Sequence, residues 1–84
     1  SAIYTTQAVE LIWAANSEPD LGGYNVYRHE EGGAFQKLNP ESLRTPLFRD
    51  AEVEPARAYI YRTTAVDLTN NESAPSAEIR VDTQ

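Results

Sequence analysis

Two-residue alternation of side chains constrains this chain more than any other feature. The clearest case is residues 59–66, Y-I-Y-R-T-T-A-V, in which two tyrosines alternate with an isoleucine and an arginine. Side chains of a β-strand point alternately to its two faces, so this pattern predicts a strand with one buried face. We expect the odd positions to face a core and the even positions to face outward. The odd positions are Tyr59, Tyr61, Thr63 and Ala65, and the even positions are Ile60, Arg62, Thr64 and Val66.

The same period recurs along the chain, between segments rich in Gly, Pro, Asn and acidic residues. It predicts strands at 8–14, 24–30, 35–38, 47–50, 58–66 and 77–81. No window shows the 3.6-residue period of an amphipathic helix. Short strands separated by turns indicate an all-β sandwich or a small barrel.

A chain of 84 residues forms one domain, and we assign residues 1–84 to it. Each predicted strand has one apolar face, as a half-buried antiparallel sheet requires. Trp13 is the single tryptophan, and we expect it at the centre of the core. The predicted core residues are Trp13, Tyr24, Val26, Val53, Tyr59 and Tyr61.

The charge distribution argues against nucleic acid as a partner. The net charge is −6, from thirteen acidic and seven basic residues, and the basic residues are scattered. Phosphate backbones require a concentrated basic surface. No apolar run approaches the roughly 20 residues of a membrane-spanning helix, so no membrane insertion is predicted. The chain has no cysteine and therefore no disulfide.

Five segments, in this order and spacing, resemble a fibronectin type III domain of the bacterial extracellular type. They are VELIW (9–13), DLGGYNVYR (20–28), FRDAEV (48–53), PARAYIYRTTAVD (55–67) and NESAPSAEIRV (71–81). The resemblance spans residues 7–82. It implies an immunoglobulin-like β-sandwich of two antiparallel sheets, one of three and one of four strands, with a short or trimmed first strand.

The resemblance also implies a role for Tyr59, which begins the sixth strand six residues after Val53. Its hydroxyl is expected to bond to main chain in the preceding turn. The turn itself reads PARA, where the family prefers a glycine after the proline. The integrin-binding sequence R-G-D of some members is absent, so that adhesive function is not implied.

No catalytic residue and no cofactor is predicted. The one histidine, His29, adjoins Glu30 and Glu31 at a strand end, where a solvated side chain is expected. No G-x-S-x-G motif occurs. Carboxylates are plentiful, but hairpin loops of so small a domain offer little cleft in which paired acids would act.

In the implied sandwich, the loops 16–22 and 67–74 lie at the same end. Their oxygen-bearing side chains form a weak candidate calcium set, chiefly Glu18, Asp20, Asp67 and Asn70, with Asn16, Asn71 and Glu72 nearby. The spacing matches no established calcium loop. The same residue types build ordinary turns, so we favour the interpretation that Asp67 and Asn70 bond their own backbone.

The outward face of the four-stranded sheet supplies candidates for partner contact. Tyr27, Ile60, Arg62 and Val66 would form a mixed aromatic, aliphatic and basic patch there. Cross-strand pairing of such residues also stabilises a sheet by itself, and we favour that structural interpretation. A partner on this face would be another protein or another domain of the same chain.

The leading functional hypothesis is a non-catalytic spacer or protein-contacting module of a larger exported bacterial protein. The chain is expected to be monomeric in isolation and, from the resemblance, extracellular, cell-surface or periplasmic. The alternative is an accessory polysaccharide-binding domain attached to a carbohydrate-active enzyme. Sugar binding needs exposed aromatic rings, for which Tyr27 and Tyr4 are the candidates.

Overall fold

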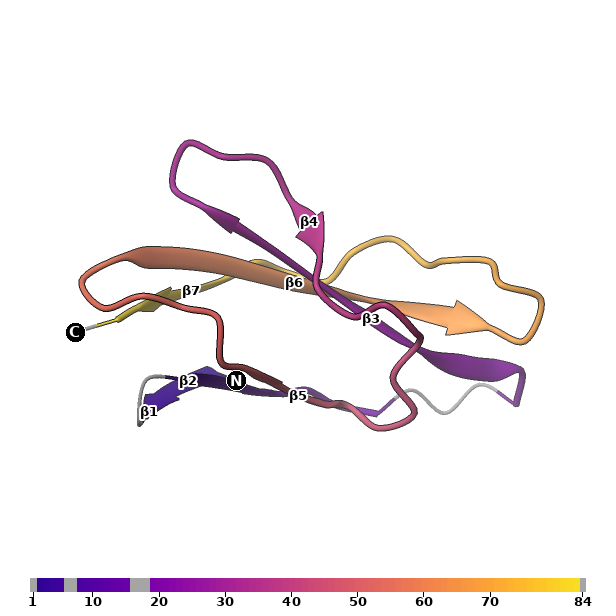
Figure 1. The fold of residues 1–84 in the computed structure, drawn as a ribbon. Helices are drawn as coiled ribbons and strands as arrows, with labels where there is room; N and C mark the ends of the chain where they lie inside the picture. Colours follow the sequence, from indigo (N-terminus) through magenta and orange to yellow (C-terminus); the bar gives the residue numbers. More distant parts are fainter. Residues whose placement is uncertain (1, 6–7, 16–18, 84) are drawn as a thin grey trace.

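The computed structural model describes residues 2–5, 8–15 and 19–83. Every regular element in that part of the chain is a β-strand (Figure 1). The strands are β1 (Ala2–Thr5), β2 (Ala8–Ile12), β3 (Leu21–Glu30), β4 (Gln36–Lys37), β5 (Leu47–Asp50), β6 (Ala58–Asp67) and β7 (Ile79–Asp82).

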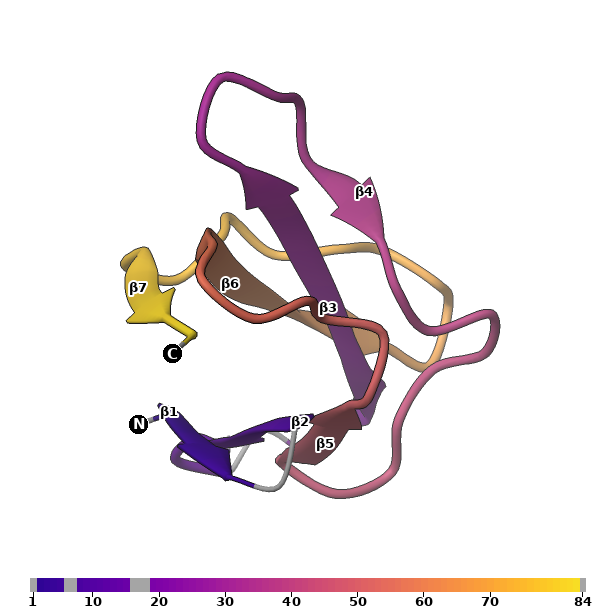
Figure 2. The same ribbon diagram turned by 60° about the vertical axis from the view of Figure 1, so that its left-hand side comes forward.

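The strands form two antiparallel sheets that face each other as layers (Figure 2). One sheet has three strands in the order β1-β2-β5, and the other has four in the order β4-β3-β6-β7. The expected all-β sandwich of three plus four strands is therefore confirmed. The first strand is indeed short, with Ala2 to Thr5 paired to Leu11 to Ala8 of β2.

The longest strands, β3 and β6, pair from Leu21 with Asp67 to Glu30 with Tyr59 and form the centre of the four-stranded sheet. β3 begins at Leu21, three residues earlier than predicted, and its register to β6 shifts between Leu21 and Gly23. A Cβ atom at Gly22 would lie 2.8 Å from the carbonyl oxygen of Asp67. Glycine thus allows the two backbones to approach closely where the sequence had indicated only a turn.

The core lies between the sheets. Val9 and Leu11 from one sheet meet Val26 and Tyr61 from the other, and all four are at most 1% exposed. The other predicted core residues, Tyr24, Val53 and Tyr59, are also buried.

Trp13 does not occupy the centre of the core, contrary to expectation. It follows the last residue of β2 and is partly buried, with its backbone N–H bonded to the carbonyl of Pro46. Its ring packs edge-on against Tyr24, with the ring centroids 5.5 Å apart. The alternation placed Trp13 on the correct face of the strand, but β2 ends before the tryptophan and leaves it at the margin.

The predicted alternation along β6 holds for Tyr59 and Tyr61, which are buried, and for Ile60 and Arg62, which are not. Towards the end of the strand the expected exposure fails, although Thr64 still lies on the outward face with Tyr27, where both bond to Glu72. Thr64 and Val66 were expected to face solvent, yet they are 6% and 4% exposed. The cause is the loop after β6, which folds back so that Glu72 forms an isolated β-bridge with Val66.

The turn before β6 has the hydrogen bond expected of Tyr59. The backbone N–H of Glu54 donates to the tyrosine hydroxyl over 2.8 Å. Ala56, which stands where the family prefers glycine, has a φ of 61°. That left-handed conformation is the one glycine adopts without strain.

Candidate functional site

The weak calcium set is only partly within the described structure, since Asn16 and Glu18 lie outside it. Asp67 uses its carboxylate to close its own turn. One oxygen accepts the backbone N–H groups of Thr69 and Asn71 at 2.9 and 2.8 Å. The backbone N–H of Asn71, with further hydrogen bonds from this turn, lowers the pKa of Asp67 below its ordinary value.

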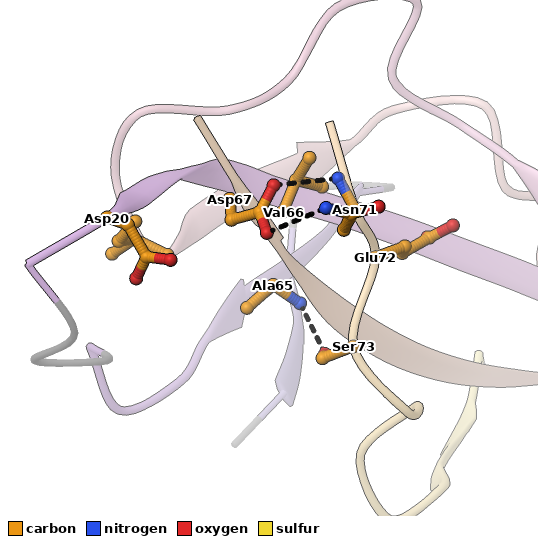
Figure 3. Close-up of a pocket in the computed structure, with 8 residues that line it drawn as sticks. Asp20, Ala65, Val66, Asp67, Asn71, Glu72 and Ser73 are labelled. Carbon is orange, nitrogen blue, oxygen red and sulfur yellow. Dashed lines mark hydrogen bonds between the residues drawn. The ribbon is translucent and has the colours of Figure 1, made fainter. Parts of the chain in front are cut away.

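Asp20 and Asp67 nevertheless line one open hollow of about 310 Å³, together with Asn71 and Glu72 (Figure 3). Asn70 is not among the lining residues and takes the left-handed conformation, with a φ of 69°. The residues described in the structure contain no group of three or more His, Asp or Glu side chains arranged to hold a metal ion. Asp67 therefore bonds to the backbone of its own turn, which is the interpretation that the sequence favoured for this residue.

Glu72 reaches from the same loop across the outward face of the four-stranded sheet. Its Oε2 accepts hydrogen bonds from the side chains of Asn25, Tyr27 and Thr64. The hydroxyl of Thr64, followed by that of Tyr27, lowers the pKa of Glu72. The same contact with Glu72 raises the pKa of Tyr27. Glu72 therefore fastens the loop to the sheet and buries Thr64.

Phe35, from the segment between β3 and β4, covers a second part of that face. The guanidinium carbon of Arg62 lies 3.9 Å from the centre of its ring. His29 packs edge-on against the same ring, with the centroids 4.4 Å apart. A cation over an aromatic face is an attractive contact in its own right.

The four predicted partner-contact residues thus have different surroundings. Tyr27 is bonded to Glu72, Arg62 lies under Phe35, Val66 is buried, and Ile60 is half-buried. The chain's own loops cover the centre of the predicted patch. Tyr4, a candidate for sugar stacking, packs against the core instead.

A buried charged network joins the two sheets and was not anticipated. Asp50 of β5 is 4% exposed, and its Oδ2 lies 2.7 Å from Nη1 of Arg28 on β3. The Tyr61 hydroxyl of β6 donates to the same oxygen over 2.6 Å. Burial, with this bond to Asp50, raises the pKa of Tyr61 well above its usual range. A signal was present, because alternation in residues 47–50 places Asp50 on the inward side with Phe48.

Asn39 is a second buried polar residue whose burial the sequence pattern did not predict. It is 2% exposed, and its Oδ1 accepts the backbone N–H of Val26 over 2.8 Å. Its amide nitrogen donates to the carbonyls of Tyr24 and Glu41 at 3.3 and 2.8 Å. Pro40 follows, and the asparagine side chain completes the edge of β3 where β4 has ended.

The outward face of the three-stranded sheet differs from that of the four-stranded sheet because it exposes large aliphatic side chains. Ile3, Ile12 and Leu47 on this face are 58%, 56% and 51% exposed. Ile12 and Leu47 are direct cross-strand partners. Beside them, Glu10 and Arg49 form an exposed ion pair with a 3.7 Å separation.

An apolar groove of about 210 Å³ opens between the sheets at the margin of the core. Leu11 and Trp13 line one side of it, and Tyr61, Thr63 and Ile79 line the other. Arg62 is the one charged residue among those that line the groove.

No family model matches the chain. It is 36% identical over 69 residues to an amylopullulanase of Thermoanaerobacterium thermosulfurigenes, an alignment that covers 81% of this chain and 4% of that protein. It is 32% identical over 88 residues to exoglucanase B of Cellulomonas fimi, covering 100% of this chain and 7% of that protein. The chain therefore spans less than a tenth of the length of these relatives.

Among solved structures, a β-1,2-glucanase of Parabacteroides distasonis contains a similar fold. The TM-score is 0.79 at 23% sequence identity, over 98% of this chain and 12% of the glucanase chain. In the described part of the present structure, no helix is long and apolar enough to cross a membrane.

Proposed function

We propose that this chain is a non-catalytic accessory domain, of the fibronectin type III kind, within a larger polysaccharide-degrading enzyme. Its role is that of a spacer that contacts a neighbouring domain. One observation carries the proposal. Exoglucanase B aligns with 100% of this chain using 7% of its own length, so one small segment of a large enzyme corresponds to this whole sandwich.

The state of the carboxylates supports a role without catalysis. Asp67 closes its own turn, Glu72 accepts three side-chain hydrogen bonds, and Asp50 is paired with Arg28 between the sheets. Acid–base catalysis requires a carboxylate that is free to exchange a proton with a substrate in a cleft. These three carboxylates instead stabilise the fold.

Two features support the fibronectin type III kind of domain. The sheets have three and four strands, and the hydroxyl of Tyr59 bonds to main chain in the turn before its strand. Within this proposal the location is extracellular, because polymeric polysaccharides do not cross a cell membrane and an enzyme that degrades them acts outside it.

The aromatic residues favour a spacer over a sugar-binding platform. A platform presents flat rings to solvent, yet Tyr4 packs against the core. Tyr27 donates its hydroxyl to Glu72, and Phe35 stacks on Arg62. The aromatic side chains thus stabilise the domain itself.

The test is to incubate the purified domain with pullulan, amylopectin and cellulose. We expect no release of reducing sugar. We also expect no retention of the domain on cellulose, or in gels that contain pullulan or amylopectin, beyond that of a protein of similar size and charge. Release of sugar would overturn the non-catalytic assignment. Specific retention, lost in a Tyr27→Ala variant, would replace the spacer by the polysaccharide-binding alternative.

A further inference from the structure

We propose that the outward face of the three-stranded sheet docks against a neighbouring domain of the same polypeptide. We call this surface the β1-β2-β5 face and define it by Ile3, Glu10, Ile12, Leu47 and Arg49. The inference rests on the proposed function, because it requires that the chain is part of a larger enzyme.

The apolar side chains of this face lie next to one another. Ile12 on β2 is opposite Leu47 on β5. Ile3 on β1 is opposite Glu10, two residues before Ile12 on the same side of β2, so Ile3 and Ile12 are diagonal neighbours. Such neighbours are about 7–8 Å apart, a distance that long side chains can span. The three side chains therefore form one stripe across the sheet.

This stripe departs from what a water-facing sheet requires. An antiparallel sheet with one solvated side normally carries polar residues on that side. Four large hydrophobic residues are exposed in the described part of the chain, and three of them lie on the β1-β2-β5 face. The fourth, Leu68, is in the loop after β6.

The outward face of the four-stranded sheet is covered by side chains from the domain's own loops. There, Glu72 binds Asn25 and Thr64, and Phe35 packs on Arg62. On the β1-β2-β5 face, the ion pair between Glu10 and Arg49 joins two residues of the sheet itself. The aliphatic stripe is therefore expected to be buried by contact with a partner from outside the domain.

The chemistry of the face points to a protein partner. Ile3, Ile12 and Leu47 are aliphatic, whereas sugar binding needs exposed aromatic rings, and none of the residues that define this face is aromatic. Aliphatic side chains bordered by a charged pair resemble the apolar centre and polar rim of a protein interface.

The small size of the face favours contact with a domain of the same polypeptide over contact with a second copy of this chain. Three strands of four or five residues span roughly 200 Å² in projection, from the spacing of strands and residues. The accessible surface of their outward side chains is larger than this projection but comes from only a few residues, whereas a standard interface uses about 20–30 residues on each side. A stable complex between free proteins buries about 800 Å² on each partner. A covalent tether supplies an effective concentration of the order of millimolar, at which a small contact suffices.

The absence of cysteine from the chain allows a direct test. Leu47→Cys places a thiol on the face, and Leu68→Cys places one on an exposed loop away from it. Each variant is labelled with a maleimide, once in the 84-residue domain and once in the full-length parent enzyme with its own cysteines replaced. We expect similar rates for both thiols in the domain, and labelling of Leu47→Cys about tenfold slower in the parent.

A further variant shows that protection comes from docking. Ile12→Lys, added to Leu47→Cys in the parent, should restore fast labelling, because it places a charge in the apolar centre of the contact. Equal rates for Leu47→Cys in domain and parent would overturn the inference while leaving the spacer assignment intact. Protection in the isolated domain at high concentration, with a dimer in sedimentation, would assign the face to a second copy. If the Leu47→Cys thiol were protected from maleimide only after soluble glucan is added, the β1-β2-β5 face would be a sugar-binding surface.

Discussion

At the scale of single residues, Ala56 is the clearest point of strain. Its φ of 61° is the left-handed conformation, in which the Cβ of a non-glycine residue crowds the following carbonyl. Its backbone N–H bonds to the carbonyl of Thr83, so the turn is held in place by the end of the chain beyond β7. Alanine at this position therefore has a structural cost that glycine would avoid.

We expect Ala56→Gly to stabilise the domain by about 0.5–1 kcal/mol, the relief of left-handed strain less the entropy of glycine. Chemical denaturation measures the change. Ala51→Gly is the matched control, since Ala51 is exposed and is not among the residues of positive φ. It should destabilise slightly. A destabilising effect of the same size for both variants would show that the turn at Ala56 is not strained.

Tyr59→Phe should destabilise the domain by about 1–2 kcal/mol, because it leaves the N–H of Glu54 without its hydroxyl acceptor. The ring itself stays buried, so the fold should persist. The unfolding midpoint in urea is the appropriate measurement. A variant as stable as the parent would argue against a structural role for the hydroxyl.

At the scale of strands and loops, the buried contact of Asp50 with Arg28 and Tyr61 joins β5 to β3 and β6. Asp50→Ala would leave the guanidinium of Arg28 largely buried without its carboxylate. Removing one partner of a buried pair costs about 3 kcal/mol or more. We expect a large fall in melting temperature. Glu31→Gln, which breaks the exposed pair with Arg80, should leave it unchanged; equal effects of the two variants would contradict the account.

The loop after β6 should make stability depend on pH. The pKa of Glu72 is lowered in the folded state, so the stabilisation is present above its ordinary value near 4.5 and is lost as pH falls through the lower folded value. Asp67 acts in the same direction. We expect Glu72→Gln to be less stable than the parent at pH 7, with the difference shrinking below pH 4.5. Thermal melts at several pH values test this, and a constant difference would contradict it.

The strands were predictable and the covering loops were not. Alternation alone located β2, β5 and β6, because a strand with one buried face leaves a period of two in the sequence. It failed at Val66, where burial depends on a loop that returns over the sheet. It was wrong at Phe35, which it assigned to a strand at 35–38, whereas β4 comprises only Gln36–Lys37. The position of Phe35 over Arg62 follows from how the hairpin loop folds and from no local pattern.

The charged network illustrates a different limit. Alternation does place Asp50 on the inward side of β5 with Phe48, so an inward carboxylate was visible in the sequence. Its partners Arg28 and Tyr61 come from two other strands. Only the packing of one sheet on the other brings those three side chains together. The role of Tyr59 followed from the family resemblance, and its hydrogen bond is present in the structure.

At the scale of the whole molecule, the two outward faces differ. Loops of the chain cover the four-stranded sheet, whereas the three-stranded sheet presents Ile3, Ile12 and Leu47 to solvent. The sequence directed attention to the first face because its residues are aromatic and basic. The aliphatic stripe is assembled from three strands, and its exposure became visible only once the sheets were placed.

The central claim is that this domain supports an enzyme without taking part in its chemistry. The most direct measurement is deletion of residues 1–84 from the parent enzyme, followed by kinetics on a short soluble oligosaccharide and a thermal melt. We predict kcat/KM within about twofold of the intact enzyme, with a lower melting temperature because a docked neighbour has been removed. A large loss of kcat with an unchanged melting temperature would contradict the account.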